Sequence, residues 1–503
     1  MTINVLEYLE KSAIAFPNKI IFSDNRRSIS YFDFVKEAKQ IASSLIQNGF
    51  YKQPIAVFTD RNIETLVMYI AVLYSGNYYI PIDIKMPLNR IELIFKSIPL
   101  ACFLYFDKQI DLIVEILGIY KCFSYSELLE SSINFLEIDK IRDRSIDADA
   151  IFVLFTSGST GIPKGVVISH RSVIAYMDWL SEVFCFSDKT IFGNQAPFYF
   201  SMSILDLYST FKNSSTLHII PTNYFSFPPQ LMNYLKEKSV NTIYWTPSAL
   251  SIVANLKALG KIALPNLKMI LFAGEVMPTK QFNMWRKEFP DAIFVNLFGP
   301  TEFTDICLYY IVKKDFLDNE VIPIGRPCRN VDAFMINKKN EVINNGIGEL
   351  CVRGSFLSLG YINNKEDNNN YFIQNPQHNL YPEKIYKTGD LVKKNKFDEY
   401  IFVSRKDSQI KIMGYRVELG EIETLVSAMC GVDFCACVFN AKDRIITLFY
   451  CSDNISADEL KKHTTENLPS YMVPKRIILL TSIPMNPNGK IDRKTLSLLA
   501  EKM

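Results

Sequence analysis

The chain has 503 residues, about three times the length of a typical single domain, so it can bury more than one hydrophobic core. Its 55 lysines and arginines nearly balance its 53 aspartates and glutamates, and the formal charge of +2 excludes a protein that holds nucleic acid or acidic membranes mainly by charge. Hydrophobic residues at 48% and charged residues at 21% exclude extensive disorder.

The cysteines and the N-terminus indicate a reducing compartment. The one tight cysteine pair, Cys435 and Cys437, is too close for zinc-finger spacing, which favours reduced and mostly buried thiols. The N-terminus lacks the basic segment of a signal peptide, and the longest apolar stretch, near residues 66–73, is too short to span a bilayer. We therefore expect a cytoplasmic protein with no nucleic-acid partner and no membrane insertion.

The first 150 residues alternate helical and strand patterns. Residues 5–15 and 31–47 have the periodicity of amphipathic helices, and residues 54–58 that of a buried strand. Residues 151–155 form a short apolar run that leads directly into a polar loop, which is typical of a strand. This alternation predicts an α/β fold.

The remaining elements divide into three regions. Residues 241–274 repeat a strand, helix and strand, with 268–272 as the second buried strand, and residues 321–361 have the short alternating strands of a small β-rich layer. Past residue 405 the pattern predicts a compact α+β unit of about 100 residues. The hydrophilic stretch 363–379 is expected to be a mobile surface loop.

A loop rich in glycine and hydroxyl groups follows the run at 151–155. Residues 156–165 read TSGSTGIPKG. Backbone N–H groups, hydroxyls and an ammonium in one loop suit a bound polyphosphate, although the spacing is not that of a P-loop. A flexible turn is the alternative, but its position after a buried strand favours the phosphate site.

A second motif places a carboxylate at the end of a strand. Residues 298–302 read FGPTE and follow the apolar run 293–297. Ligands of α/β sheets bind at the carboxyl ends of strands, and a carboxylate there can hold Mg²⁺ against phosphate oxygens.

Further strings follow in the last part of the chain. Residues 386–390 read YKTGD, whose aspartate could accept two ribose hydroxyls, and residues 409–423 read QIKIMGYRVELGEIE. Residues 488–493 read NGKIDR and place Lys490 on a glycine turn. A plain surface lysine is the alternative for Lys490.

Taken in this order, the strings resemble the adenylate-forming (AMP-binding) superfamily of acyl-CoA synthetases, luciferases and nonribosomal-peptide adenylation domains. The resemblance runs from about Tyr31 to Leu496 and includes GELCVRG at 348–354 and LPSYMVP at 468–474. The motifs are most similar to those of ligases that load D-alanine onto a carrier protein, which resemble NQAPF at 194–198 and GYRVEL at 414–419.

The resemblance implies the architecture. Residues 1–404 would form a large N-terminal AMP-binding domain of two α/β sheets and a distorted β-barrel. Residues 405–503 would form a small mobile α+β lid domain with a hinge at Asp407. Ser404 stands where the family has glycine, and both residue types suit a turn.

By the same resemblance, most of the strings bind ATP and Mg²⁺. The family pattern assigns the phosphates to Thr156, Ser157, Gly158, Thr160 and Lys164, the adenine to Gly274, Phe298 and Gly299, and the ribose to Asp390 and Arg405. Glu302 would bind Mg²⁺, and Thr301, Glu302 and Lys490 would be the catalytic residues.

The resemblance also implies two half-reactions at one site. Lys490 would bridge the acid's carboxylate and the α-phosphate while the acyl-adenylate forms. Rotation at Asp407 would then bring Gly414 against a pantetheine thiol that attacks the adenylate. One preorganised cation of this kind typically contributes about 2.7 to 4 kcal/mol to the transition state.

One departure from the pattern concerns the acid itself. Members that activate α-amino acids have an aspartate after the phenylalanine of a Phe-Asp-x-Ser string, whereas this chain has Phe200, Ser201, Met202 and Ser203. Breaking a buried charge pair costs about 3 to 5 kcal/mol. Either the acid has no α-amino group or another carboxylate replaces the missing one.

Asp305 is the candidate replacement, because the family pattern places its position in the wall of the same pocket. A solvated loop acid is the alternative. We expect Asp305 to anchor an amine displaced from the α-position, or else the acid is a hydroxy or plain acyl one. The rest of the expected pocket is mostly apolar and comprises Phe200, Ser201, Met202, Leu205, Tyr244, Leu271, Ala273, Leu297 and Ile306. D-alanine ligases usually have cysteine at the position of Ala273, which argues against D-alanine.

The expected function is ATP-dependent activation of a small carboxylic or amino acid as an acyl-adenylate, followed by transfer to the phosphopantetheine of a separate carrier protein. Because ten residues follow Arg493, we expect the carrier to be a separate protein. An acyl- or aryl-CoA synthetase is the second hypothesis. A nucleotide-binding protein without activity is a third, against which Lys490, Glu302 and Asp390 argue.

Overall fold

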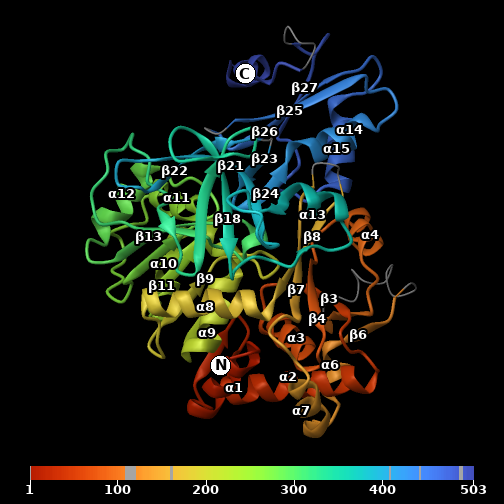
Figure 1. Ribbon diagram of the computed structural model, residues 1–503, viewed down its shortest axis with the longest axis vertical. Coiled ribbons are helices and arrows are strands. Elements are labelled where there is room, and N and C mark those ends of the chain that lie inside the picture. Colours follow the sequence, from red (N-terminus) through yellow and green to blue (C-terminus); the bar gives the residue numbers. More distant parts are fainter. Residues whose placement is uncertain are drawn as a thin grey trace. The chain divides into compact units, whose positions relative to one another are not determined.

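The computed structural model describes residues 2–107, 120–158, 162–406, 409–440, 443–485 and 491–502 (Figure 1). The chain folds as an α/β protein with two compact units. The first unit comprises Met1–Ile84, Pro99–Leu154 and Gly165–Ser404, and the second comprises Lys85–Ile98, Phe155–Lys164 and Arg405–Met503. A hinge at Asp407 and movement of the second unit stay predictions.

A mainly parallel sheet carries the motif at 298–302. Its strand order is β15 (Arg326–Pro327), β14 (Leu308–Ile311), β13 (Ile293–Phe298), β12 (Met269–Phe272), β11 (Thr242–Trp245), β9 (Ile191–Asn194), β10 (Thr216–Ile219), β1 (Ile20–Ser23) and β2 (Ser28–Ser30). The strands from β13 to β1 run parallel, while β14, β15 and β2 run antiparallel to their neighbours.

A second sheet contains β7, the strand that leads into the glycine-rich loop. Its order is β19 (Gly360–Tyr361), β8 (Lys164–Ser169), β7 (Ala150–Thr156), β4 (Tyr78–Asp83), β3 (Pro54–Thr59), β5 (Cys102–Tyr105) and β6 (Cys122–Ser124). Strand β3 is buried along its whole length, as expected for a parallel strand covered on both faces.

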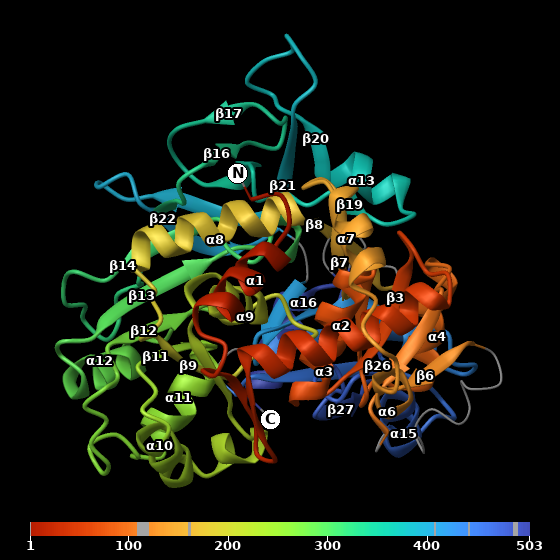
Figure 2. The same cartoon turned by 90° about the horizontal axis from the view of Figure 1, so that it is seen from below.

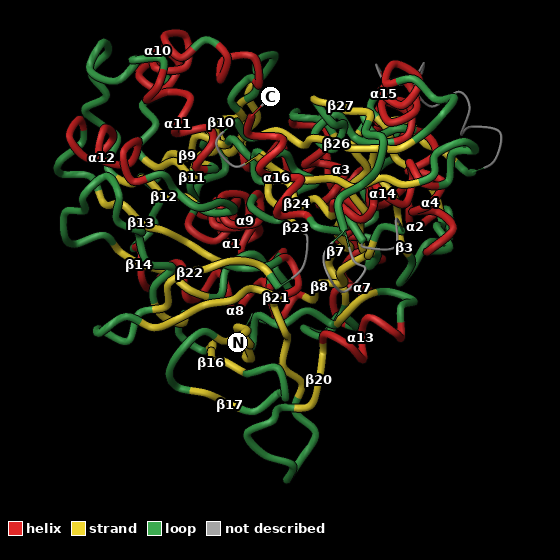
Figure 3. The backbone as a smooth tube through the Cα atoms, turned by 90° about the horizontal axis from the view of Figure 1, so that it is seen from above, coloured by secondary structure: helices red, strands yellow, loops and turns green. Residues whose placement is uncertain are grey.

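A third, antiparallel sheet forms the expected β-rich layer (Figure 3). Its order is β17 (Val342–Ile343), β16 (Val331–Ile336), β18 (Gly348–Gly354), β21 (Lys384–Lys394) and β20 (Phe372–Gln374), and β22 (Tyr400–Arg405) also pairs with β21. The expectation of one mobile loop at 363–379 is wrong, because helix α13 (Lys365–Tyr371) and strand β20 form there. The Asn364 side chain accepts the backbone N–H of Asp367 and so caps this helix.

Several helices of the first unit begin at clear sequence signals. The Ser30 side chain caps α2, and Thr246 followed by Pro247 starts α11. The other helices of this unit have conventional lengths, and α2 and α3 lie side by side in Figure 2. Their bounds are α1 (Leu6–Ala15), α2 (Tyr31–Gln47), α3 (Ile63–Tyr74), α6 (Tyr125–Leu129), α7 (Phe135–Asp143), α8 (His170–Phe184), α9 (Ser203–Asn213), α10 (Pro228–Glu237), α11 (Pro247–Asn255) and α12 (Thr279–Glu288).

Alternation along the first sheet separates two cores. Tyr244, Leu271 and Leu297 point to the face that packs with α8 and α9. Ile243 and Ile270, one residue away along their strands, point to the opposite core beneath α10, α11 and α12. The residues expected to line the acid pocket therefore share one face of this sheet.

The second unit is a smaller α+β body. It contains α4 (Leu88–Ser97), β23 (Gln409–Ile412), β24 (Tyr415–Glu418), α14 (Leu419–Ser427), β25 (Phe434–Asn440), β26 (Ile445–Cys451), α15 (Ala457–Asn467), β27 (Arg476–Leu479) and α16 (Arg493–Lys502). Ser456 and Glu459 form a capping box at the start of α15. Across the described residues, no helix is both long and apolar enough to cross a bilayer.

Candidate active site

The strand β13 ends in a tight turn that needs glycine. A Cβ atom at Gly299 would lie 2.3 Å from the carbonyl oxygen of Asp305 and 2.8 Å from the backbone nitrogen of Cys307. The Cys307 N–H donates to the Phe298 carbonyl at 2.8 Å and closes the turn. Within it, Thr304 and Asp305 have φ angles of 50° and 82°. Such φ angles are uncommon for residues with a side chain.

Glu302 lies in the short 3₁₀ turn Thr301–Phe303 and is fully buried. Its Oε1 atom accepts the Tyr361 hydroxyl at 2.6 Å, and that hydroxyl lies 3.4 Å from the hydroxyl of Tyr386. Tyr386 opens the string that ends at Asp390. Two expected nucleotide motifs are thus joined through tyrosines.

Ser201 and Thr301 meet although they are 100 residues apart in the sequence. The Thr301 hydroxyl donates to the Ser201 hydroxyl at 3.4 Å. Ser201 stands where amino-acid-activating members have aspartate, and Thr301 belongs to the expected catalytic turn. The expected acid pocket and the expected magnesium motif are therefore adjacent.

Asp305 is a buried carboxylate and not a solvated loop acid. Its side chain is 3% exposed, and its Oδ2 atom accepts hydroxyls from Tyr176 at 3.0 Å and from Tyr244 at 3.1 Å. Burial, and then the charge of Asp305, raise the pKa of both tyrosines well above the ordinary value. Both phenols therefore keep their protons and donate to this carboxylate.

The other expected wall residues are buried around the same sheet face. Met202 and Leu205 lie at the start of α9, and Ala273 follows β12. Each of these three side chains is at most 2% exposed. Phe200 is half-buried and packs against the same core. The structure thus brings the expected pocket residues of the first unit to one place.

The glycine-rich loop belongs to the second unit. Ser157 is 4% exposed and its hydroxyl donates to the Arg416 carbonyl at 2.9 Å, while the Thr156 hydroxyl donates to the Lys164 carbonyl at 3.4 Å. A Cβ atom at Gly158 would lie 2.1 Å from the Ile162 carbonyl oxygen. Glycine is therefore required for the loop to fold back here.

The expected nucleoside contacts fall in both units. In the first unit Gly274 has a φ of 93°, and the ring centroids of Phe298 and Phe402 lie 6.3 Å apart. Asp390 is buried on β21, and its backbone N–H donates to the Thr388 hydroxyl. In the second unit Arg405 donates to the Gln409 side chain at 2.8 Å.

Gly414 occupies the tip of the hairpin between β23 and β24. Ile412 pairs with Tyr415, so the turn consists of Met413 and Gly414, whose φ angles are 51° and 85°. A two-residue turn with positive φ at both positions is the type I′ hairpin turn. Thr160, Asp407 and Lys490 lie outside the described residues.

Several residues of the site could not be predicted from the sequence. Tyr176 lies within the amphipathic helix α8, and Tyr361 within the two-residue strand β19. Arg61 donates to the carbonyl oxygens of Asn194, Gln195 and Ala196 at 2.7 to 2.9 Å and thereby fixes the loop that leads to α9. The string NQAPF at 194–198 was the available signal for this loop.

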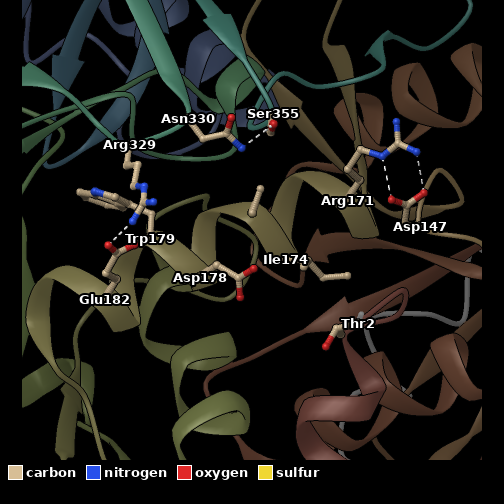
Figure 4. A pocket seen from close by; sticks show the side chains of 11 residues that line it. Thr2, Asp147, Arg171, Ile174, Asp178, Trp179, Glu182, Arg329, Asn330 and Ser355 are labelled. Atoms are coloured by element: carbon tan, nitrogen blue, oxygen red, sulfur yellow. Dashed lines mark hydrogen bonds and ion pairs between the residues drawn. The ribbon is translucent and has the colours of Figure 1, made fainter.

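A groove of about 710 Å³ runs along α8, away from these residues (Figure 4). Its arginines pair with carboxylates of the same groove, Arg171 with Asp147 and Arg329 with Glu182, and Asp178 pairs with Lys212 outside it. None of the expected site residues that the structure describes lines it.

Comparison with known families gives two matches. Residues 9–362 match the model of the AMP-binding enzyme family, and residues 421–490 match that of the AMP-binding enzyme C-terminal domain.

Curated relatives match along nearly the whole chain. The D-alanine–D-alanyl carrier protein ligase of Bacillus cytotoxicus is 29% identical over 98% of this chain and 98% of its own. Tyrocidine synthase 1 of Brevibacillus parabrevis is 28% identical over 98% of this chain, which spans 45% of that relative's length. Among solved structures, the Vibrio cholerae adenylation domain AlmE in complex with glycyl-adenosine-5′-phosphate has a TM-score of 0.87, with 19% identity over 100% of this chain and 98% of that one. This likeness shows the fold.

Proposed function

Because the chain belongs to the AMP-binding enzyme family, we propose that it activates a small carboxylic or amino acid with ATP and transfers the acyl group to a carrier-protein thiol. The observation that carries the proposal is the contact between Thr301 and Ser201, which joins the catalytic turn to the acid pocket. A ligase that condenses an acid with a nucleotide needs the acid site and the nucleotide site to lie next to each other.

The residues present fit Mg²⁺ bound together with nucleotide phosphates. Magnesium takes oxygen ligands and typically uses one or two carboxylates, with phosphate oxygens and water completing its shell. Glu302 supplies one carboxylate, fixed by Tyr361, beside the hydroxyl of Thr301. The ion would neutralise phosphate charge, and Glu302 would hold it.

The chemistry proceeds in two displacements. A carboxylate oxygen of the acid attacks the α-phosphorus of ATP, the bond to the β,γ-phosphates breaks, and pyrophosphate leaves. The developing negative charge would be met by Lys164, Lys490 and backbone N–H groups of the loop at 156–165. The pantetheine thiolate then attacks the acyl carbon, and AMP leaves with the bonding electron pair.

Asp305 is proposed to bind an amine of the acid. The buried carboxylate of Asp305 accepts the hydroxyls of Tyr176 and Tyr244, and a cationic amine nearby would stabilise its charged form. Its position replaces the carboxylate missing at Ser201, so the amine would be displaced from the α-position. The mostly apolar remainder of the pocket indicates a small acid.

The test is ATP–pyrophosphate exchange across α-amino, β-amino, hydroxy and plain acids. We expect exchange with an amine-bearing acid, release of AMP and not ADP, and a large rise in KM for that acid in Asp305→Asn. If an ordinary α-amino acid is preferred and the substitution leaves its KM unchanged, the displaced-amine assignment is wrong.

Thiol specificity is measured in the same system. Holo carrier protein and coenzyme A are supplied separately, and acyl transfer is followed with radiolabelled acid. Preferential turnover of coenzyme A would show that coenzyme A, and not the carrier protein, is the acceptor. Absence of exchange with every acid, together with retained ATP binding, would leave a nucleotide-binding protein without this activity.

A further inference from the structure

Asp206 is a buried carboxylate that the proposed reaction does not yet use. It lies in the first turn of α9 and is 1% exposed. Its Oδ2 atom accepts the Asn194 amide at 2.9 Å. Its Oδ1 atom is buried and has no hydrogen-bond partner among the residues that the structure describes. A buried acceptor left unsatisfied costs about 1 to 3 kcal/mol, so a donor group brought to this oxygen by a bound molecule would be stabilising.

The position of Asp206 connects it to the acid pocket. Met202, which precedes it by four residues, is an expected wall residue, and this spacing puts the two side chains on one side of the helix start. Its partner Asn194 is the register neighbour of Tyr244 on the adjacent strand β11. Asn194 and Tyr244 therefore project from the same face of the sheet.

These neighbours hold two different carboxylates. The short Asn194 side chain reaches Asp206, and the long Tyr244 side chain reaches Asp305. Asp206 consequently lies close to the strand ends, whereas Asp305 lies beyond the phenol ring. The charge of Asp206, after burial and Asp305, also contributes to the raised pKa of Tyr244. One pocket wall thus has two acidic positions at different depths.

We propose that Asp206 is a specificity-determining residue whose Oδ1 atom accepts an N–H or O–H group of the acid, so that the acid has a second hydrogen-bond donor besides the amine at Asp305. This inference rests on the proposed function. A single nitrogen would satisfy only one of the two carboxylates, because the length of the Tyr244 ring separates them. Acids with two donors, such as amino-hydroxy and diamino acids, satisfy both.

Matched acids test the proposal by pyrophosphate exchange. The pairs are 3-amino-2-hydroxypropanoate with 3-aminopropanoate, 4-amino-3-hydroxybutanoate with 4-aminobutanoate, and 2,4-diaminobutanoate with 4-aminobutanoate. We expect kcat/KM to be about 10- to 100-fold higher for the two-donor member of at least one pair, the range for satisfying a buried acceptor. Asp206→Leu should reduce that preference to about unity, and Asp206→Asn should reduce it at least tenfold if the leucine variant does not fold.

The control variants separate recognition from folding. Ser209→Ala changes a buried polar residue on the same helix one turn later and should keep the preference. Asp305→Asn should lower kcat/KM for both members of a pair, because both have the amine. A purely structural Asp206 would lower exchange equally for the two members.

Two outcomes overturn the inference while leaving the proposed function intact. One is exchange in which the wild type does not distinguish the members of any pair. The other is a preference that Asp206→Asn and Asp206→Leu both preserve. Failure of the proposed function would instead appear as no exchange with any acid.

Discussion

Three buried acidic side chains of the first unit accept hydrogen bonds from different donors. Glu302 accepts from Tyr361, Asp305 accepts from Tyr176 and Tyr244, and Asp206 accepts from Asn194. Burial raises the pKa of Asp206 to about 7, despite the opposing effects of Asn194 and Arg61. Carboxylates whose environments differ in this way can serve different roles within one pocket.

The turn at Gly299 tolerates no side chain. Gly299→Ala would force a methyl group against the backbone of Asp305 and Cys307, and overpacking of this kind costs about 1 to 3 kcal/mol. We expect a lower denaturant midpoint and loss of pyrophosphate exchange, because the turn also positions Glu302. Gly346→Ala, where no atom lies within 4 Å of a Cβ, should keep normal exchange and lose stability only through its φ of 84°. Normal exchange in both variants would contradict this account of the turn.

Lys490 is assigned a role in the first half-reaction alone. Lys490→Ala should lower the rate of pyrophosphate exchange by about 100- to 1000-fold while sparing transfer from preformed acyl-adenylate to the carrier thiol. Lys494→Ala, at an exposed position of α16, is the matched control and should leave both rates unchanged. Retained exchange in the Lys490 variant would remove this lysine from its role.

At the scale of elements, the loop between β9 and α9 is held by one arginine from the end of another sheet. The guanidinium of Arg61 also donates to the Asn194 side chain at 3.0 Å and to the Ile220 carbonyl at 3.0 Å. Strands β9 and β10 and the start of α9 are thereby fixed together. Since α9 carries Met202, Leu205 and Asp206, this clamp positions one wall of the acid pocket.

Arg61→Lys should break the clamp, because an ammonium cannot reproduce the planar fork of five donors. We expect a loss of about 1 to 3 kcal/mol in the free energy of unfolding. The substitution should also raise the KM for the acid more than it raises the KM for ATP. Arg329→Lys, whose side chain is 73% exposed and pairs only at the surface with Glu182, should change stability by less than about 0.5 kcal/mol. Equal effects of the two substitutions would argue against the clamp.

At the scale of the whole molecule, buried histidines make stability depend on pH. Burial, followed by the charge of Lys238, lowers the pKa of His218 to about 4, and burial followed by Arg142 lowers that of His170 to about 3. In the unfolded chain both would titrate near the ordinary value of about 6.5. Below pH 6.5 the unfolded chain therefore binds more protons, and the free energy of unfolding falls until the pH passes the folded pKa values.

Denaturant unfolding at pH 6.5 and pH 5.0 measures this effect. Each histidine should account for a loss of up to about 2 kcal/mol over this interval, so His218→Gln should lose correspondingly less stability than wild type. Asp206 acts in the opposite direction, because its raised pKa lets the folded protein bind a proton as the pH falls. That contribution is present in both proteins and cancels in the comparison. Identical losses would show that His218 does not titrate as assigned.

Much of the secondary structure could be predicted from the sequence. The helix at 31–47 and the strands before the motifs at 156 and 298 have strong hydrophobic periodicity, and they form where that periodicity predicts. The stretch at 363–379 was mispredicted because its asparagines are typical of loops, yet Asn364 uses its side chain to start a helix. Local capping there outweighs composition.

The sequence by itself determined the α/β class, the strings that bind nucleotide in the family, and Asp305 as the candidate replacement for the carboxylate missing at Ser201. Only the tertiary structure decided that Tyr176 and Tyr244 contact Asp305, that Tyr361 contacts Glu302, and that Asn194 contacts one oxygen of Asp206 while the other has no hydrogen-bond partner among the described residues. The physical reason is that motifs record backbone turns and charges, which are local. A tyrosine or an asparagine in a helix or strand has no local signature of the distant carboxylate that it meets when the sheets pack.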